Sequence, residues 1–161
     1  MVKVNRKEAE PMKEGYVDNR FASLYYKEMG QGMPLIMLHG NGESHEIFAR
    51  LSELMSRYYR VILMDSRGHG SSLMKEEAAG GDLTIPDMAA DVVQVMEFLH
   101  VPRAVILGFS DGANVALETA SCYPGRVSAV VAVSGNALPR GMSTASLLEV
   151  KLKYALWRGL E

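Results

Sequence analysis

Cysteine is almost absent from this sequence: Cys122 is the only one in 161 residues. A single cysteine cannot form an intramolecular disulfide, which is typical of proteins that work in a reducing compartment. The sequence also lacks an apolar run long enough to span a bilayer. Residues 1–14 are charged and lack the apolar core of a signal peptide. We therefore predict a soluble, cytoplasmic protein.

An excess of charge of one sign is missing as well. The chain carries 17 basic and 19 acidic residues, a formal net charge of −2, so neither nucleic acid nor an anionic membrane is expected as a partner. No G-x-G-x-x-G fingerprint and no phosphate-loop motif occurs, and no group of His, Cys and carboxylate residues has the spacing of metal ligands. We expect no metal and no cofactor.

What the sequence does contain is an alternation of apolar runs with amphipathic stretches. An aromatic-rich segment at 16–26, broken at Asp18-Asn19, predicts a hairpin of two strands. Continuous apolar runs predict buried strands at 34–38, 60–64, 104–107 and 126–133. Helices are predicted between these strands. This order predicts an α/β fold with a doubly wound, mostly parallel sheet and an N-terminal hairpin.

The predicted helices carry more detailed expectations. Ser44 and Thr84 are expected to cap the first two helices, and a third is predicted at 114–121. Asp91 is expected on the solvent side of the second helix, and His45 and His100 on helix surfaces. A last helix is predicted at 143–161. One inward-facing stripe of the first helix is expected to contain Ile47, Phe48, Leu51, Leu54, Met55 and Tyr58.

The chain is organised around Gly108-Phe109-Ser110-Asp111-Gly112, which lies between a predicted strand and a predicted helix. Strand, sharp turn and helix around G-x-S-x-G is the arrangement called a nucleophile elbow. The turn forces its serine into a strained backbone conformation. Gly108 and Gly112 must be small because strand and helix approach closely there. The pattern predicts that the Ser110 hydroxyl stands clear of the sheet.

Two further motifs follow predicted strands, His39-Gly40-Asn41-Gly42 and the segment 65–72 with sequence DSRGHGSS. Together with the elbow they lie at the carboxyl ends of parallel strands, the edge where open α/β sheets bind ligands. These three motifs closely resemble the α/β-hydrolase superfamily, especially its esterase, lipase and C–C hydrolase-like members. The resemblance runs from about Tyr16 to Asn136. It implies a core at 1–141 and the start of a cap or lid helix at 142–161.

The resemblance also implies a role for each motif residue. Ser110 is the implied nucleophile, and the backbone N–H groups of Asn41 and Asp111 form the implied oxyanion hole, which stabilises the negative oxygen of a tetrahedral intermediate. Phe109 either lines the acyl pocket or packs in the core. The Asp111 side chain is favourable at a helix N-terminus, and His39 is expected to support its loop. The implied substrate is a small carboxylic ester or similar acyl compound.

One departure from the family pattern limits these implications. The triad of this fold follows the order Ser, then Asp or Glu, then His, and no histidine follows His100 here. We therefore expect a hydrolase truncated before its triad acid and histidine, inactive by itself. The strand predicted at 127–133 would then lie at an exposed edge. Its lack of Lys and Pro predicts self-association or a need for the missing carboxyl-terminal half.

Two other functions remain open at this point. The chain is alternatively a non-catalytic remnant that binds a small ligand or a partner chain. A nucleotide-binding Rossmann-like domain is disfavoured by the elbow and by the missing glycine fingerprint.

Overall fold

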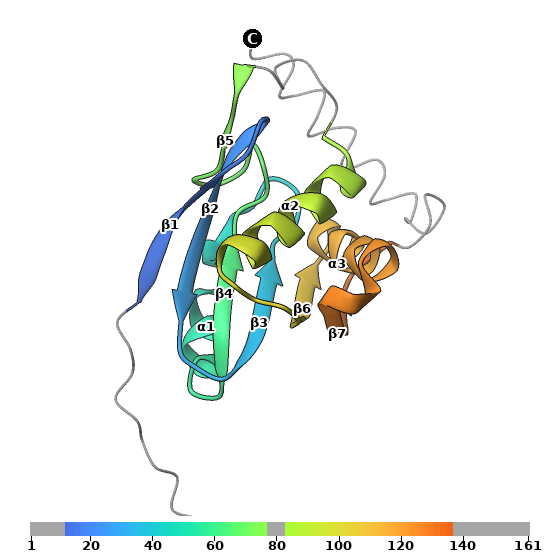
Figure 1. Cartoon of the computed structure of the whole chain (residues 1–161). Coiled ribbons are helices and arrows are strands. Elements are labelled where there is room, and N and C mark those ends of the chain that lie inside the picture. Colours follow the sequence, from blue (N-terminus) through green and yellow to red (C-terminus); the bar gives the residue numbers. More distant parts are fainter. Residues whose placement is uncertain (1–11, 77–82, 137–161) are drawn as a thin grey trace, which may run out of the picture.

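The computed structural model describes residues 12–76 and 83–136 of the chain. Within them one mixed sheet has the strand order β1-β2-β4-β3-β6-β7, with β5 paired to β2 (Figure 1). The β1–β2 and β2–β4 pairs are antiparallel, whereas β4, β3, β6 and β7 are parallel. The strands are β1 (Lys13–Asp18), β2 (Ala22–Met29), β3 (Met33–Leu38), β4 (Tyr59–Met64), β5 (Leu73–Met74), β6 (Ala104–Phe109) and β7 (Val127–Val133).

Helices cover both faces of this sheet. On one face α2 (Ile85–Phe98) and α3 (Asp111–Cys122) pack against the larger apolar cluster, which includes Ile36, Ile62 and Ile106. The 3₁₀ helix η1 (His45–Phe48) and α1 (Ala49–Met55) lie on the other face, where Phe48 joins Leu35 and Leu63. A second 3₁₀ helix, η3 (Pro124–Arg126), precedes β7. The predicted fold class, a doubly wound and mostly parallel sheet with an N-terminal hairpin, is confirmed.

Both predicted helix caps are present. The Thr84 hydroxyl accepts a hydrogen bond from the Asp87 backbone N–H at 3.3 Å, and the Ser44 hydroxyl accepts from Glu46 N–H at 3.3 Å. Each cap satisfies an N–H that has no partner within its own helix. None of the helices in the described parts of the chain is both long and apolar enough to cross a membrane.

The expectation for the first helix is wrong in its packing. Only Phe48 of the predicted stripe is buried, with Met55 packed partly against the same cluster. Ile47, Leu51 and Leu54 are 44%, 37% and 49% exposed. The helical period is correct, but α1 is short and packs mainly against η1 and β4. The apolar stripe of α1 therefore faces outward.

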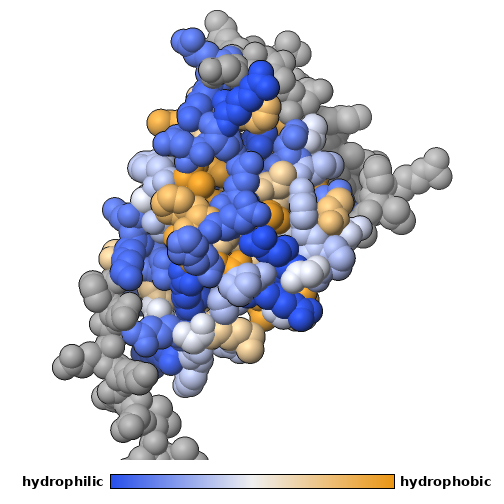
Figure 2. All heavy atoms as spheres, viewed as in Figure 1, coloured by the Kyte–Doolittle hydropathy of each residue, from blue (hydrophilic) through white to orange (hydrophobic). Residues whose placement is uncertain are grey.

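β7 ends the described sheet, and it is exposed on the face that carries α1. Val131 and Val133 pair in register with Leu107 and Phe109 of β6, and they are 46% and 43% exposed. On the other face α3 packs against β7, and the surface of that side is largely hydrophilic with smaller apolar areas (Figure 2). The helix predicted at 143–161, and with it the cap expected at 142–161, lies outside the described residues.

Candidate active site

The turn between β6 and α3 holds Ser110 in a conformation that is rare for a residue with a side chain. Its φ is 53° and its ψ is −118°, a strained combination that persists only where the surroundings fix it. They do so here through backbone hydrogen bonds on both sides of the residue. Ser110 N–H donates to the Val133 carbonyl at 2.8 Å, and the Ser110 carbonyl accepts from Ala113 N–H at 2.9 Å. The end of β7 therefore holds the turn in place.

The glycines beside Ser110 lie where no β-carbon fits. A β-carbon at Gly108 would collide with the Gly112 carbonyl oxygen, and one at Gly112 would collide with the carbonyl oxygens of Leu38 and His39. A β-carbon at Gly40 would lie 3.0 Å from the β-carbon of Ser110. Strand β6, helix α3 and the loop after β3 therefore meet at backbone distance around the serine.

A cavity of about 210 Å³ opens beside this turn. Both Asn41 and Asp111 line it, whereas Ser110 itself is not among its lining residues. Within residues 12–76 and 83–136, neither the Asn41 nor the Asp111 backbone N–H donates a hydrogen bond. Backbone N–H groups without acceptors are able to stabilise a negative oxygen that is placed against them. The cavity walls include Ile85 and Met88 of α2.

Phe109, the residue before Ser110, packs on the α1 face of the sheet. It is half-buried and packs against the apolar cluster on the α1 face, which contains Met37 and Phe48. It does not appear among the residues that line the cavity. Phe109 therefore packs in the core, and its role in an acyl pocket stays a prediction.

His39 is a buried, neutral side chain that fastens two loops. Ser66 N–H donates to His39 Nε2 at 3.0 Å, so the proton lies on Nδ1, which is 2.7 Å from the Gly40 carbonyl oxygen. Burial lowers the pKa of His39, and the hydrogen bond to Gly40 only partly opposes this effect. His39 Nε2 lies 3.8 Å from the Asp65 carboxylate oxygen Oδ1, and because the ring is neutral this contact is not an ion pair. His39 holds the loop after β3 against the loop after β4.

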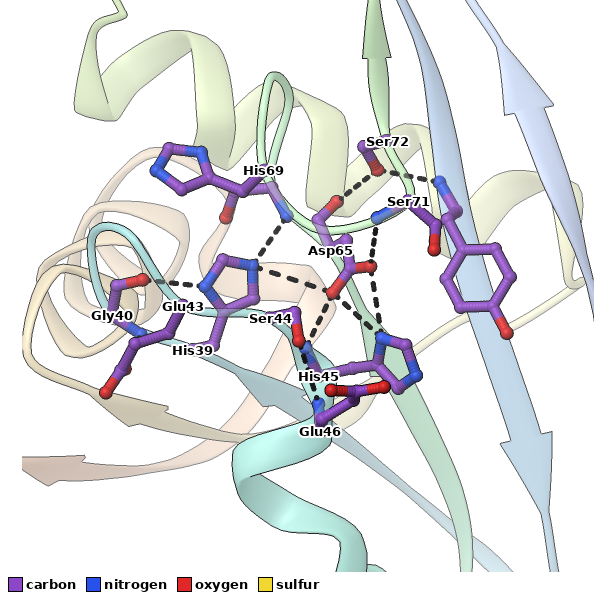
Figure 3. Close-up of polar contacts among 12 residues, drawn as sticks. His39, Gly40, Glu43, Ser44, His45, Glu46, Asp65, His69, Ser71 and Ser72 are labelled. Atoms are coloured by element: carbon purple, nitrogen blue, oxygen red, sulfur yellow. Dashed lines mark hydrogen bonds and ion pairs between the residues drawn. The ribbon is translucent and has the colours of Figure 1, made fainter. Parts of the chain in front are cut away.

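The buried carboxylate of Asp65 joins the same two loops (Figure 3). It accepts hydrogen bonds from the backbone N–H groups of His45, at 2.6 Å, and Ser71, at 2.8 Å. The His45 ring Nδ1 lies 3.0 Å from both carboxylate oxygens. His45 is thus not a surface residue, contrary to the sequence-based prediction, and its side chain is only 13% exposed. His100, in contrast, is exposed as predicted.

Arg67 and Asp91 form a buried ion pair behind these loops. Arg67 Nε and Nη2 donate to the two Asp91 oxygens at 2.6 and 2.7 Å, and Asp91 is 1% exposed. The hydrogen bonds to Asp91 raise the pKa of Arg67. The prediction that Asp91 faces solvent is therefore wrong, because the guanidinium of a residue 24 positions earlier draws it inward. The pair fixes the loop after β4 to α2.

His69 directly contacts the loop after β3, which contains Asn41. Its Nε2 lies 3.0 Å from the Asn41 side-chain oxygen and its Nδ1 lies 3.1 Å from the Arg67 carbonyl oxygen. The ring points away from the Asp65 carboxylate (Figure 3). Sequence reasoning missed this contact. The described residues contain no group of three or more His, Cys, Asp or Glu side chains arranged to hold a metal ion.

Comparison with known proteins places this site in a family. The family model described as alpha/beta hydrolase fold matches residues 33–159. The chain belongs to the alpha/beta hydrolase fold family. This confirms the resemblance drawn from the three motifs, since all three lie within the matched residues.

Several relatives of this chain are known. The chain is 32% identical over 146 residues to a proline iminopeptidase from Neisseria gonorrhoeae, covering 87% of this chain and 45% of the relative. It is 31% identical over 113 residues to a pimeloyl-[acyl-carrier protein] methyl ester esterase from Chromobacterium violaceum, covering 70% and 41%. A hydrolase structure from Pseudomonas aeruginosa PA01 is similar with a TM-score of 0.75 and 25% identity, covering 89% of this chain and 52% of that one. This chain therefore spans about half the length, or less, of these relatives.

Proposed function

We propose that this chain carries the nucleophile and the oxyanion hole of a serine hydrolase that acts on a carboxylic ester or similar acyl compound. Ser110 is the proposed nucleophile, and the backbone N–H groups of Asn41 and Asp111 are the proposed oxyanion donors. The observation that carries the proposal is a strained serine beside a cavity that Asn41 and Asp111 line. Within the described residues the backbone N–H groups of Asn41 and Asp111 have no acceptor. One relative is named a methyl ester esterase, which matches this class of reaction.

In the proposed reaction the Ser110 oxygen attacks the carbonyl carbon of the ester. The carbonyl oxygen becomes negative and is stabilised by the two N–H donors. When the oxygen–carbon bond to the leaving group breaks, the alcohol departs with the proton that Ser110 loses. Water then cleaves the acyl–serine bond, which releases the carboxylic acid and restores the hydroxyl.

The proton transfer is the step for which the described residues offer no partner. The Ser110 hydroxyl makes no hydrogen bond within residues 12–76 and 83–136. The rings of His39, His45 and His69 all contact other groups. Removing the histidine of a serine hydrolase triad lowers kcat by about a millionfold, so we expect this chain alone to react slowly.

The experiment is covalent labelling of the 161-residue chain with a fluorophosphonate, followed by peptide mass spectrometry. We expect slow modification of Ser110, none in Ser110→Ala, and unchanged labelling in the control Ser121→Ala, which alters an exposed serine near the end of α3. Modification that persists in Ser110→Ala would disprove the assignment of the nucleophile.

The second candidate is a non-catalytic protein that binds a ligand or a partner chain. Within the described residues no histidine contacts the Ser110 hydroxyl, which favours this candidate, as does the exposed apolar face of β7. Complete absence of Ser110 labelling by the fluorophosphonate, in a chain that melts cooperatively, would support this candidate over the hydrolase.

A further inference from the structure

Asp111 is unusual because it combines, in one residue beside the cavity, a negative side chain and a backbone N–H that is a proposed oxyanion donor. Asp111 lines the cavity and is partly exposed. Its carboxylate has one contact, the Asn114 side-chain amide, at 3.4 Å. In the part of the chain that the structure describes, no Lys, Arg or His lies within ion-pair distance of it.

A carboxylate in this position opposes the proposed reaction. The transition state places negative charge on the oxygen bound by Asp111 N–H, and a like charge on the same residue repels it. A positive charge in the cavity would remove this penalty. The protein does not supply one through His39, which is neutral because burial lowers its pKa. The nearby Arg67 is paired with Asp91 in the core.

We propose that the cavity takes acyl substrates that carry an ammonium group on the carbon next to the carbonyl, that is, esters or similar derivatives of α-amino acids. This inference rests on the proposed function and names its substrate class. The carbonyl oxygen binds the N–H of Asp111 and the ammonium group binds its carboxylate. The carbonyl oxygen and the ammonium nitrogen of such a substrate are three bonds apart. The backbone N–H and the side chain of one residue can span this separation.

The rest of the cavity fits the remainder of such a substrate. Ile85, Met88 and Val115 form an apolar wall, which suits an uncharged amino acid side chain. A bond between an ammonium and a carboxylate is charge-assisted and is stronger than a neutral hydrogen bond. An uncharged acyl ester of the same shape leaves the Asp111 carboxylate without a cationic partner. The cavity therefore discriminates by charge as well as by shape.

A pair of covalent probes tests this proposal. One is a diphenyl ester of an α-aminoalkyl phosphonate with an isopropyl side chain, and the other is the same compound without the amino group. Ser110 attacks phosphorus and phenol leaves with the serine proton, so each probe reports on the same nucleophile. We expect the amino probe to label the 161-residue chain at least tenfold faster than the deamino probe.

Asp111→Asn keeps the shape of the side chain and the backbone N–H but removes the charge. We expect the ratio of the two labelling rates to fall to about one in this variant. Glu118→Gln is the matched control, since it removes the same charge from the same helix about two turns away. The ratio should stay at its original value there. Equal rates for both probes in the unaltered chain would overturn the proposal while leaving the nucleophile intact.

If neither probe labels the chain, that result counts against the proposed function itself. A binding measurement then tests the ammonium site separately. In Ser110→Ala, titration with L-valinamide is followed by the amide resonances of Asn41 and residues 111–115. We expect L-valinamide to shift these resonances and isovaleramide, which lacks the amino group, to leave them unchanged. When Asp111→Asn is added to Ser110→Ala, the affinity for L-valinamide should be at least tenfold weaker. Equal affinity for the two amides, or no shift with either of them, would refute the ammonium site.

Discussion

Gly112, the second residue of α3, packs directly against the carbonyl oxygen of Leu38, the last residue of β3. The start of the helix that follows Ser110 is therefore fixed to the strand that leads into the loop of Asn41. Contact through backbone atoms leaves little freedom, because neither partner can move without moving its element. The relative position of the serine and the two N–H donors follows from this contact.

Gly112→Val should disrupt this contact. The new side chain would meet the carbonyl oxygens of Leu38 and His39, and neither can rotate away. Overpacking of this kind costs about 1–3 kcal/mol, and a clash with backbone places the cost at the upper end. Chemical denaturation measures the loss in the free energy of unfolding, and fluorophosphonate labelling measures the loss at Ser110.

Gly125→Val is the matched control, since nothing lies within 4 Å of a β-carbon at Gly125. We expect its stability to change by less than about 1 kcal/mol. If Gly112→Val keeps both the stability and the labelling rate of the original chain, α3 does not approach β3 as closely in solution as the structure shows.

Separating Arg67 from Asp91 should destabilise the protein strongly. Asp91→Ala leaves a buried guanidinium without its partner, and breaking a buried pair in this way costs about 3–5 kcal/mol. Glu97→Ala is the control, because it breaks the more exposed pair with Arg126, at 3.4 Å, and such pairs contribute about 0–1 kcal/mol. Urea unfolding distinguishes the two. Equal effects would show that the Arg67–Asp91 pair is not buried in solution.

The stability should fall in mild acid because of His39. Burial lowers the pKa of this imidazole below its ordinary value of 6.5, so the unfolded chain binds a proton at a higher pH than the folded chain does. The stabilisation is complete above about pH 6.5 and is lost as the pH falls through the lower pKa of the folded state. Each pKa unit of the difference corresponds to about 1.4 kcal/mol.

His39→Asn removes this titration, so its free energy of unfolding should depend less on pH below about 6.5 than that of the unaltered chain. His100→Asn, which changes an exposed histidine, should keep the original dependence. Urea unfolding at a series of pH values supplies both comparisons. An NMR titration that places the pKa of His39 at or above 6.5 would contradict this explanation.

The exposed face of β7 should make the isolated chain self-associate. Ala129, Val131 and Val133 are exposed on the face that α1 leaves open, and an apolar strand at a sheet edge without charges pairs readily with another chain. We expect oligomers in light scattering and a lower mean mass for Val131→Lys. Leu73→Lys alters an apolar residue on β5 that is 63% exposed and should not change the mass. A monomeric, cooperatively melting chain would rule this association out.

Much of the fold could be predicted because its elements follow from short-range patterns. Apolar runs at 34–38 and 60–64 predict β3 and β4 to within one residue at their starts. The G-x-S-x-G pattern predicts a turn in which Gly108 and Gly112 are packed against backbone, and the structure places them so. These features depend on residues within a few positions of each other, where chain geometry leaves few choices.

The pairs that link distant segments could not be predicted in this way. His45 and Asp91 have the spacing of surface residues on their helices, yet each turns toward a charged partner in another segment. Ile47, Leu51 and Leu54 have the spacing of a core stripe, yet they are exposed. Periodicity tells which side chains share a face, but it does not tell what lies opposite that face.

The sequence by itself determined the order of the main strands and helices along the chain, the turn at Ser110 and the family. Each of these is encoded in local patterns and motifs. Only the tertiary structure decided that Asn41 and Asp111 line one cavity, that His69 reaches the Asn41 side chain, and that the Asp111 carboxylate has no cation beside it in the described residues. These relationships join segments dozens of residues apart. They arise when β3, β4 and β6 align in one parallel sheet and bring the loops at their carboxyl ends to a single edge.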